Sequence, residues 1–443
     1  MDPNGVVLGI SIGSIWCGRR VAQRRCAGTE VSVRETDAKN RRDRRVASRI
    51  GTVALLLAVS ASACDSDPTG PVIDPTLALS TGNSHTCVID SEAGTFCWGP
   101  NGAGQIGDGT GRNQSFPAPV FGEHVFRLVT AGGSHTCGIS EDDRLFCWGD
   151  NSAGALGEPA ASYEIAPLEI TTTPLFTTIA AGAAHTCGID GDGTPFCWGS
   201  NGSGQLGSLE TTAQCGNTPC SDLPIPVAGN LTLESLAAGN SHTCGITPDG
   251  AVYCWGTNGS GQLGNGFMTR AAQPVLVKGD IGFTQVSAGT WHTCALTEMG
   301  TLYCWGSNDE GQLGVENPND RCGSLEYPCS TKPDSVETAL RFRSVTAGGG
   351  HTCAIAEDGR AYCWGDNWTG QLGDGTTIPA FAPRLVSGLG AVLAIDAGQN
   401  HTCATDNLGD VYCWGDNLIH QLGNGGVGLR RLEPTLVPIP PDP

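Results

Sequence analysis

Two neighbouring stretches, Ala347-Gly-Gly-Gly-His-Thr-Cys353 and Cys363-Trp-Gly-Asp-Asn-Trp-Thr-Gly-Gln-Leu-Gly373, decide how this 443-residue chain is organised. The tripeptide His-Thr-Cys recurs at intervals of 50, 50, 57, 50, 59 and 50 residues, and a Cys-Trp-Gly follows each copy. The seven copies begin at His85, His135, His185, His242, His292, His351 and His401. Self-similarity at such a period indicates a repeat architecture rather than several unrelated domains.

The residues within one repeat favour β-structure. Short apolar or alternating runs, such as residues 126–131, 136–139 and 145–148, are separated by turn residues, which is typical of strands. Seven such units predict an all-β fold, a seven-bladed β-propeller built from repeats of about 50 residues. An open β-solenoid is the alternative. Closure of the ring would require the strand near residues 434–437 to meet the strand near residues 77–79.

The cysteines of each repeat lie ten positions apart, across a predicted hairpin. In one repeat Glu357-Asp-Gly359 forms a three-residue loop, which places Cys353 opposite Cys363, at a separation compatible with a disulfide. The alternatives are free thiols or zinc, although zinc usually takes four ligands and a repeat offers three. We therefore expect no metal or other cofactor and seven disulfides, Cys87–Cys97, Cys137–Cys147, Cys187–Cys197, Cys244–Cys254, Cys294–Cys304, Cys353–Cys363 and Cys403–Cys413.

Two repeats are seven and nine residues longer than the others, and each carries a further cysteine pair, Cys215–Cys220 or Cys322–Cys329. Both insertions follow the Gly-Gln-Leu-Gly turn, so we expect them at equivalent places on the ring. Insertions on one face of a repeat protein often mark its binding face, and a local disulfide lowers the cost of ordering a loop. Tolerated surface variation is the alternative. The candidate partner-binding residues are Asn217, Thr218, Pro219, Leu325, Glu326 and Tyr327.

The first 75 residues have a different composition from the repeats. Residues 41–63 combine an arginine-rich stretch with a 13-residue apolar run, too short to span a bilayer, and small residues at its end, the layout of a signal peptide. Cys64 follows as the expected lipidation site, with plain secretion or no export as alternatives. We interpret residues 1–40 as a disordered leader or a mis-called start, 64–75 as a polar tether, and 76–443 as one propeller with repeats starting near 76, 126, 176, 233, 283, 342 and 391.

Charge also divides the chain. Residues 1–63 contain 11 Lys and Arg against 5 Asp and Glu, whereas residues 64–443 contain 13 against 39, a net charge of -26. Such an acidic body should be repelled by nucleic acid and by anionic lipid. We therefore expect a protein partner, no nucleic acid, and membrane contact only through a lipid anchor; the oligomeric state stays open.

No motif of the repeats predicts catalysis. One histidine per repeat favours a structural hydrogen-bonding role, because a catalytic histidine is normally single. The chain has no nucleotide-binding P-loop, EF-hand spacing, nucleophile elbow or His-Glu-x-x-His motif. Although scattered carboxylates leave an unrecognised activity open, we expect a protein that is not an enzyme.

The repeated Ala-Gly-x-x-His-Thr-Cys and Cys-Trp-Gly-x-Asn-x-x-Gly-Gln-Leu-Gly motifs resemble the regulator of chromosome condensation repeat, over roughly residues 76–440. The resemblance implies a seven-bladed β-propeller, a fold that serves unrelated functions. We expect an exported, lipid-anchored, non-catalytic scaffold of the cell envelope, periplasmic or surface-facing, that binds protein. The alternatives are a secreted inhibitor or regulator of an extracytoplasmic enzyme, guanine-nucleotide exchange by resemblance alone, and a hydrolase or lyase with a central-pocket site.

Overall fold

The computed structural model describes residues 11–14, 27–30 and 78–440, with short gaps at residues 91–93, 160, 172–173, 212, 319, 324–325 and 427. The chain divides into two units, residues 1–70 and 71–443. In the first unit β1 (Ser11–Ser14) pairs antiparallel with β2 (Ala27–Glu30), within the segment expected to be disordered. The predicted signal peptide, the tether and Cys64 lie outside the described residues.

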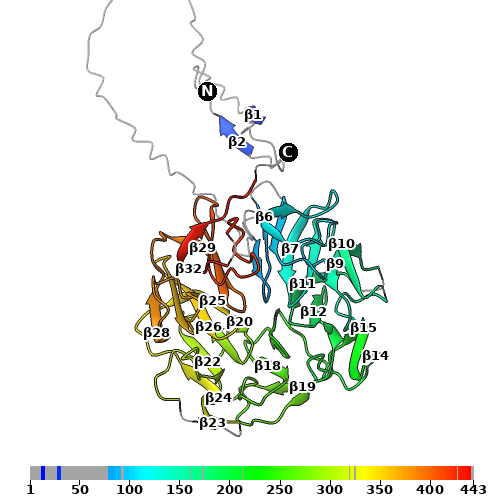
Figure 1. The fold of residues 1–443 in the computed structure, drawn as a ribbon. Helices are drawn as coiled ribbons and strands as arrows, with labels where there is room; N and C mark the ends of the chain where they lie inside the picture. The colour runs from blue at the N-terminus through cyan, green and yellow to red at the C-terminus, as the bar shows by residue number, and fades with distance from the viewer. Residues whose placement is uncertain are drawn as a thin grey trace, which may run out of the picture. The chain divides into compact units, whose positions relative to one another are not determined.

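The second unit is a ring of seven antiparallel sheets, which confirms the predicted propeller (Figure 1). Blades 1 to 3 contain β3 (Ala78–Thr81), β4 (Thr86–Ile89), β5 (Thr95–Gly99) and β6 (Gln114–Pro119); β7 (Phe126–Ala131), β8 (His135–Ser140), β9 (Leu145–Asp150) and β10 (Tyr163–Glu169); and β11 (Phe176–Ala181), β12 (His185–Asp190), β13 (Pro195–Ser200), β14 (Ala213–Cys215) and β15 (Thr218–Pro226).

Blades 4 to 7 continue the ring in the same order. They contain β16 (Ser235–Ala238), β17 (His242–Ile246), β18 (Val252–Gly256) and β19 (Ala271–Leu276); β20 (Gln285–Ala288), β21 (His292–Leu296), β22 (Leu302–Ser307), β23 (Asp320–Cys322) and β24 (Tyr327–Ser335); β25 (Phe342–Ala347), β26 (His351–Ala356), β27 (Ala361–Gly365) and β28 (Ala380–Leu385); and β29 (Val392–Ala397), β30 (His401–Asp406), β31 (Val411–Gly415) and β32 (Arg431–Leu436).

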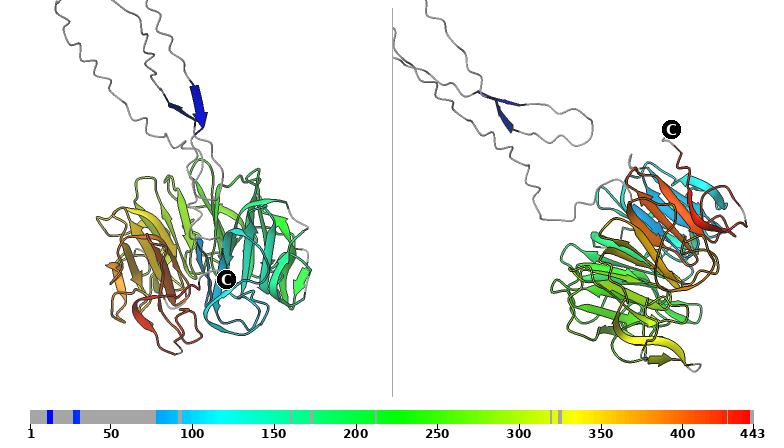
Figure 2. Two further views of the ribbon diagram at one scale, coloured as in Figure 1. Left: turned by 90° about the horizontal axis from the view of Figure 1, so that it is seen from above. Right: turned by 90° about the vertical axis from the view of Figure 1, so that its left-hand side faces the viewer.

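Each blade is built from one continuous stretch of chain, and no strand of the described residues is exchanged between blades. The colour runs around the ring, so blade 7 (red) lies beside blade 1 (blue) in Figures 1 and 2. The two segments expected to meet at closure meet by packing, not by strand pairing. Strands β32 and β3 belong to different sheets, while Val437 lies in one apolar cluster with Leu79. The ring is therefore closed by side chains.

The two insertions add a fifth strand to blades 3 and 5. Strands β14 and β23 pair with β15 and β24 at the outer edge of their sheets. Their lengthened outer hairpins distinguish these two blades from the other five. The structure thus accommodates the extra residues as an additional edge strand rather than as a loop.

The core lies between neighbouring blades rather than inside each one. One cluster combines Cys137 and Cys147 of blade 2 with Phe176, Ile179 and Trp198 of blade 3. All seven repeat tryptophans are fully buried, which accords with packing residues, because large aromatic side chains contribute much of the energy of a core. Within the described part of the chain, no helix is long and apolar enough to cross a membrane.

Candidate functional site

The second and third strands of each blade hold the repeat cysteines opposite each other. In blade 6, Cys353 pairs with Cys363 in the register of β26 and β27, with their Cα atoms 4.1 Å apart. The structure contains nine disulfides: Cys87–Cys97, Cys137–Cys147, Cys187–Cys197, Cys215–Cys220, Cys244–Cys254, Cys294–Cys304, Cys322–Cys329, Cys353–Cys363 and Cys403–Cys413. Among the described residues, no group of three or more His, Cys, Asp or Glu could hold a metal ion.

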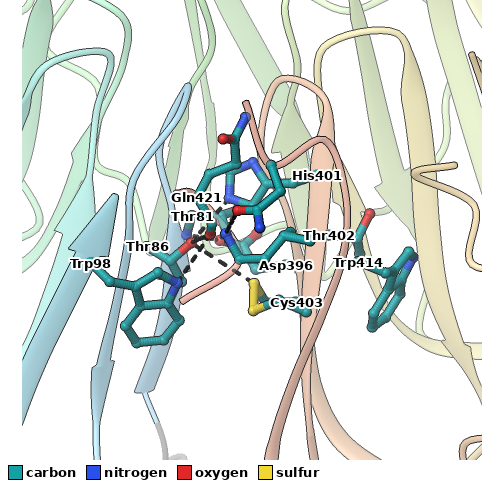
Figure 3. The surroundings of a disulfide bond; sticks show 12 residues. Thr81, Thr86, Trp98, Asp396, His401, Thr402, Cys403, Trp414 and Gln421 are labelled. Carbon is teal, nitrogen blue, oxygen red and sulfur yellow. Dashed lines mark hydrogen bonds between the residues drawn. A yellow bond between two sulfur atoms is a disulfide. The ribbon is translucent and has the colours of Figure 1, made fainter. Parts of the chain in front are cut away.

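The repeat histidines and threonines form a closed circle of hydrogen bonds through the ring. The imidazole Nε2 of His85 in blade 1 bonds Thr136 Oγ1 in blade 2 at 2.9 Å, and each later blade repeats this contact with the next one. The circle closes where His401 of blade 7 bonds Thr86 of blade 1 at 3.0 Å (Figure 3). All fourteen side chains are buried. The His-Thr pair of the motif therefore links blades.

The Gln-Leu turn supplies the acceptor that completes each link. Thr136 Oγ1 and Trp148 Nε1 of blade 2 both donate to the backbone carbonyl of Gln105 in blade 1, at 2.8 and 3.1 Å. At the next junction, alanine replaces the glutamine, and the backbone carbonyl of Ala155 in blade 2 accepts the same two bonds from blade 3. A backbone carbonyl can do so whatever side chain the residue carries. Three motifs that lie far apart in one repeat thus form a single contact between two repeats.

These contacts fix the protonation of the histidines. A carbonyl can only accept, so each threonine hydroxyl donates to it and accepts from the histidine Nε2–H. The Nδ1 atoms are left unprotonated, and those of His85, His185, His242, His292, His351 and His401 are buried without a partner. Burial lowers the pKa of the seven imidazoles from 6.5 to about 3 or about 4. The circle is therefore neutral at physiological pH, as a structural role requires.

The innermost strands surround a central cavity of about 370 Å³. Asp396 of β29 is the only acidic or basic residue among those that line it. Its carboxylate accepts bonds from Thr81 N and Oγ1 in blade 1, at 2.7 and 3.0 Å (Figure 3), and from Thr346 Oγ1 in blade 6, at 2.7 Å. Burial raises the pKa of Asp396, against the effect of these bonds. A single carboxylate thus joins the last blade to the first.

The candidate partner-binding residues lie at the tips of the two outer hairpins. Asn217, Thr218 and Pro219 are exposed, and so are Glu326 and Tyr327; Leu325 lies outside the described residues. Pro219 and Pro328 each accept a backbone bond from the preceding third-to-fourth-strand loop, at 2.8 and 2.9 Å. Each disulfide joins the last residue of the hairpin's first strand to the opposite strand, and the backbone bonds fix the hairpin to the blade body, so the tips belong to anchored elements.

Antiparallel strands place the loops of every blade at two ends. We call the end that carries the first-to-second-strand and third-to-fourth-strand loops the loop face, and the opposite end the hairpin face. Both insertions belong to the loop face, and Trp291 and Trp368, the two tryptophans of the propeller that lie outside the repeat pattern, are also exposed there. Sequence reasoning assigned them no role. It missed Asp396, although the equivalent positions hold Ser, Thr or Ala.

The repeats that form these links between blades match the models of known families. Residues 176–442 match the RCC1-like domain, and residues 93–139, 126–155 and 142–189 match single regulator of chromosome condensation (RCC1) repeats. The chain belongs to the RCC1-like domain family. The family and the fold therefore agree with the resemblance seen in the sequence.

Relatives of this RCC1-like chain match parts of it. The ultraviolet-B receptor UVR8 of Arabidopsis thaliana is 30% identical over 170 residues, 38% of this chain and 25% of the receptor. The human ubiquitin ligase HERC2 is 50% identical over 46 residues, 10% of this chain and 1% of the ligase. The chain thus spans a quarter or less of the length of these two relatives.

Solved structures resemble the whole RCC1-like ring. Human WBSCR16 superposes with a TM-score of 0.70 at 20% identity and covers 78% of this chain and 94% of its own. Prp20p of Saccharomyces cerevisiae, described with its binding to Gsp1p and histones, superposes with a TM-score of 0.67 at 22% identity, covering 78% and 85%. At this identity the likeness establishes the fold.

Proposed function

We propose that the chain is an exported, lipid-anchored propeller of the cell envelope that acts as a non-catalytic, protein-binding scaffold and holds its partner on the loop face. The observation that carries the proposal is the pair of disulfide-closed hairpins, β14–β15 and β23–β24, at equivalent positions of blades 3 and 5. Two rigid projections on one face present a surface at little ordering cost.

Export is supported by the use of cysteine. Nine disulfides suit an oxidising compartment, since thiols in the cytosol are normally kept reduced. The signal-like stretch of residues 41–63 and Cys64 after it agree with this location. The net charge of -26 in residues 64–443 argues against nucleic acid as the partner.

A protein partner also agrees with what the titles of related structures describe. Prp20p is described with its binding to Gsp1p and histones, and in a complex with Kap60. Transferred to this chain, these descriptions favour a propeller that binds protein. The stiff hairpins favour, as a second candidate, an inhibitor or regulator that blocks an extracytoplasmic enzyme, because a preorganised surface also suits an inhibitor.

The test is fractionation of cells that make the full chain, combined with labelling by a palmitate analogue. The wild type should label and partition with membranes, whereas Cys64→Ser should lose both properties. Chemical crosslinking in the envelope should capture a partner that is lost when residues 209–221 and 316–330 are deleted. Cytoplasmic chain with freely alkylated cysteines would refute export, and capture unchanged by the deletions would refute the role of the hairpins.

A further inference from the structure

The loop face of blades 5 and 6 carries a glycine where the other blades carry a side chain, and we call the surface formed by Gly350, Glu310 and Asp366 the notch. The residue before the repeat histidine is Ser, Ala, Asn or Trp in six blades and Gly350 in blade 6. A Cβ built on Gly350 would lie 3.3 Å from Asp366 Cβ, 3.8 Å from Asp366 Oδ2 and 4.0 Å from Glu310 Cγ. Acidic side chains from two neighbouring blades therefore lie beside this half-buried glycine, at the position where blade 5 carries the exposed indole of Trp291.

The exposed indole of Trp368 borders this notch. Its side chain is 62% exposed, and its ring N–H donates to the Glu310 carboxylate. Its backbone N–H donates to Asp366 Oδ1 at 2.9 Å, so Glu310 and Asp366 both contact Trp368. An aromatic ring held beside two carboxylates combines the two features that attract a cation, a negative charge and a π face.

No ion pair of the described residues includes the acidic side chains at the notch. Burial and the charges of Asp366 and Asp309 raise the pKa of Glu310. All four ion pairs among the described residues lie towards the hairpin face, and none includes these three carboxylates. Arg430 reaches the region, but its guanidinium donates to the Trp368 backbone carbonyl at 2.8 Å. The carboxylates are therefore available to a charge from outside.

The buried turn amide of blade 6 has no hydrogen-bond partner, and neither has that of Gln262 in blade 4. In blades 5 and 7 the turn glutamine donates from Nε2 to the acid of the same loop, Gln312 to Asp309 and Gln421 to Asp416, both at 3.0 Å. In blade 6 the equivalent Gln371 is fully buried, and its Nε2 has no partner. The carboxylate of Asp366 is thus free of the contact that engages Asp416.

We propose that the notch at Gly350 receives a lysine or arginine side chain of the protein partner, which pairs with Glu310 and Asp366 and stacks on Trp368. The proposal rests on the proposed function in taking the partner to be a protein, and adds the chemistry by which it is recognised. The large exposed aromatic ring suits the centre of such a contact, because tryptophan is enriched among residues that dominate binding energy. Arginine fits as well as lysine, since both cations bind aromatic faces.

The test is a titration of the purified full chain with a fluorescent nine-residue peptide of alternating glycine and lysine, at 50 and 300 mM salt. The Glu310→Gln/Asp366→Asn double variant should weaken binding about tenfold, and Trp368→Ala about fivefold, the range expected for partly desolvated cation contacts. Gly350→Lys, which places a cation in the notch, should abolish the part of the peptide binding that depends on the notch. A glutamate peptide should not bind.

Matched variants separate the notch from the general acidity of the chain. Asp249→Asn/Glu298→Gln removes the same charge from the hairpin face, and Trp291→Phe alters an exposed tryptophan outside the notch; both should bind as the wild type does. Equal loss in the Asp249/Glu298 pair, or no loss in Trp368→Ala with an unchanged circular dichroism spectrum, would overturn the proposal. The titration requires neither export nor lipid, so a chain that binds through the notch but stays in the cytoplasm would refute only the proposed function.

Discussion

Six junctions of the ring are crossed by the chain, and the seventh, between blades 7 and 1, is not. The uncrossed junction, which we call the seam, contains the same link as the others but at slightly greater length. Thr86 Oγ1 donates to the Gln421 carbonyl at 3.4 Å, against 2.8–2.9 Å at the six crossed junctions. The seam therefore depends on contacts that the chain itself does not enforce.

The seam compensates with residues found at no other junction. Asp396 takes the place of a hydroxyl or methyl side chain and accepts two bonds from Thr81. His420 replaces the first glycine of the turn and keeps its left-handed backbone, with φ +71°, a conformation that a side chain rarely adopts. The seam therefore carries an additional polar contact at the junction where the backbone is interrupted.

Acid should produce the largest effect, because all seven junctions contain the same buried imidazole. The folded pKa of about 3 or 4 lies below the unfolded value of 6.5, so the unfolded chain binds more protons and stability is lost as pH falls from 6.5 towards 4. At pH 5.5 each imidazole contributes about 1.4 kcal/mol of destabilisation, together on the order of 10 kcal/mol. Urea unfolding followed by tryptophan fluorescence at pH 7.5, 6.5 and 5.5 measures this loss.

A single cooperative transition in acid would mean that the seam and the crossed junctions open together. Two transitions, with the first confined to blades 1 and 7, would identify the seam as the weaker junction. A midpoint that does not change between pH 7.5 and pH 5.5 would contradict the neutral circle of histidines.

Removal of one blade disulfide should have the second-largest effect on folding stability. Cys403→Ala/Cys413→Ala beside the seam and Cys244→Ala/Cys254→Ala in blade 4 each open a loop of ten residues. We expect each pair to lose about 2–3 kcal/mol, as short loops closed by a disulfide do. Chemical denaturation under non-reducing conditions gives both values, and a much larger loss in blade 7 would show that its disulfide supports the seam as well as its own hairpin.

Loss of one threonine hydroxyl should have a smaller effect. Thr86→Val at the seam and Thr293→Val at a crossed junction keep the shape of the side chain but leave His401 or His242 without its acceptor. We expect about 1–3 kcal/mol for an unpaired buried donor. Hydrogen exchange should accelerate across blades 1 and 7 in Thr86→Val and stay local in Thr293→Val. Equal exchange patterns would mean that the seam opens no more readily than other junctions.

Asp396→Thr, which installs the residue found at the equivalent position of blade 6, should have the smallest effect. The threonine hydroxyl keeps one acceptor for Thr81 N. The substitution removes a carboxyl group whose pKa is raised by burial. A folded pKa above the unfolded one means that the wild type gains stability as pH falls through that value, opposite in sign to the histidines, and the variant should lack this gain. We expect the free energy of unfolding to change by less than about 1 kcal/mol at pH 7. Thermal melts at pH 7.5 and 6.5 measure it, and a loss of stability several times larger would contradict the prediction.

Repetition explains how much the sequence predicted. Seven copies reveal the blade, its hairpin and its buried tryptophan, because each copy confirms the others. Contacts that occur once are invisible in the pattern: Asp396 and Thr81 are 315 residues apart, and the notch depends on Glu310 of one blade meeting Gly350 of the next. The fifth strands β14 and β23 were missed because short polar insertions resemble loops.

Because no described strand is exchanged between blades, the connections along the chain, and not the packing, determine which blade comes first. Ile439 and Leu79 lie in one apolar cluster at the seam, so a short linker from residue 440 to residue 78 can join the blades there. A circular permutant opened between blades 4 and 5, at residues 280–281, should then form the same ring with its gap moved. A protein of this kind can be cut and rejoined at any junction, and its loop face can be fused to new segments without rearranging a single sheet.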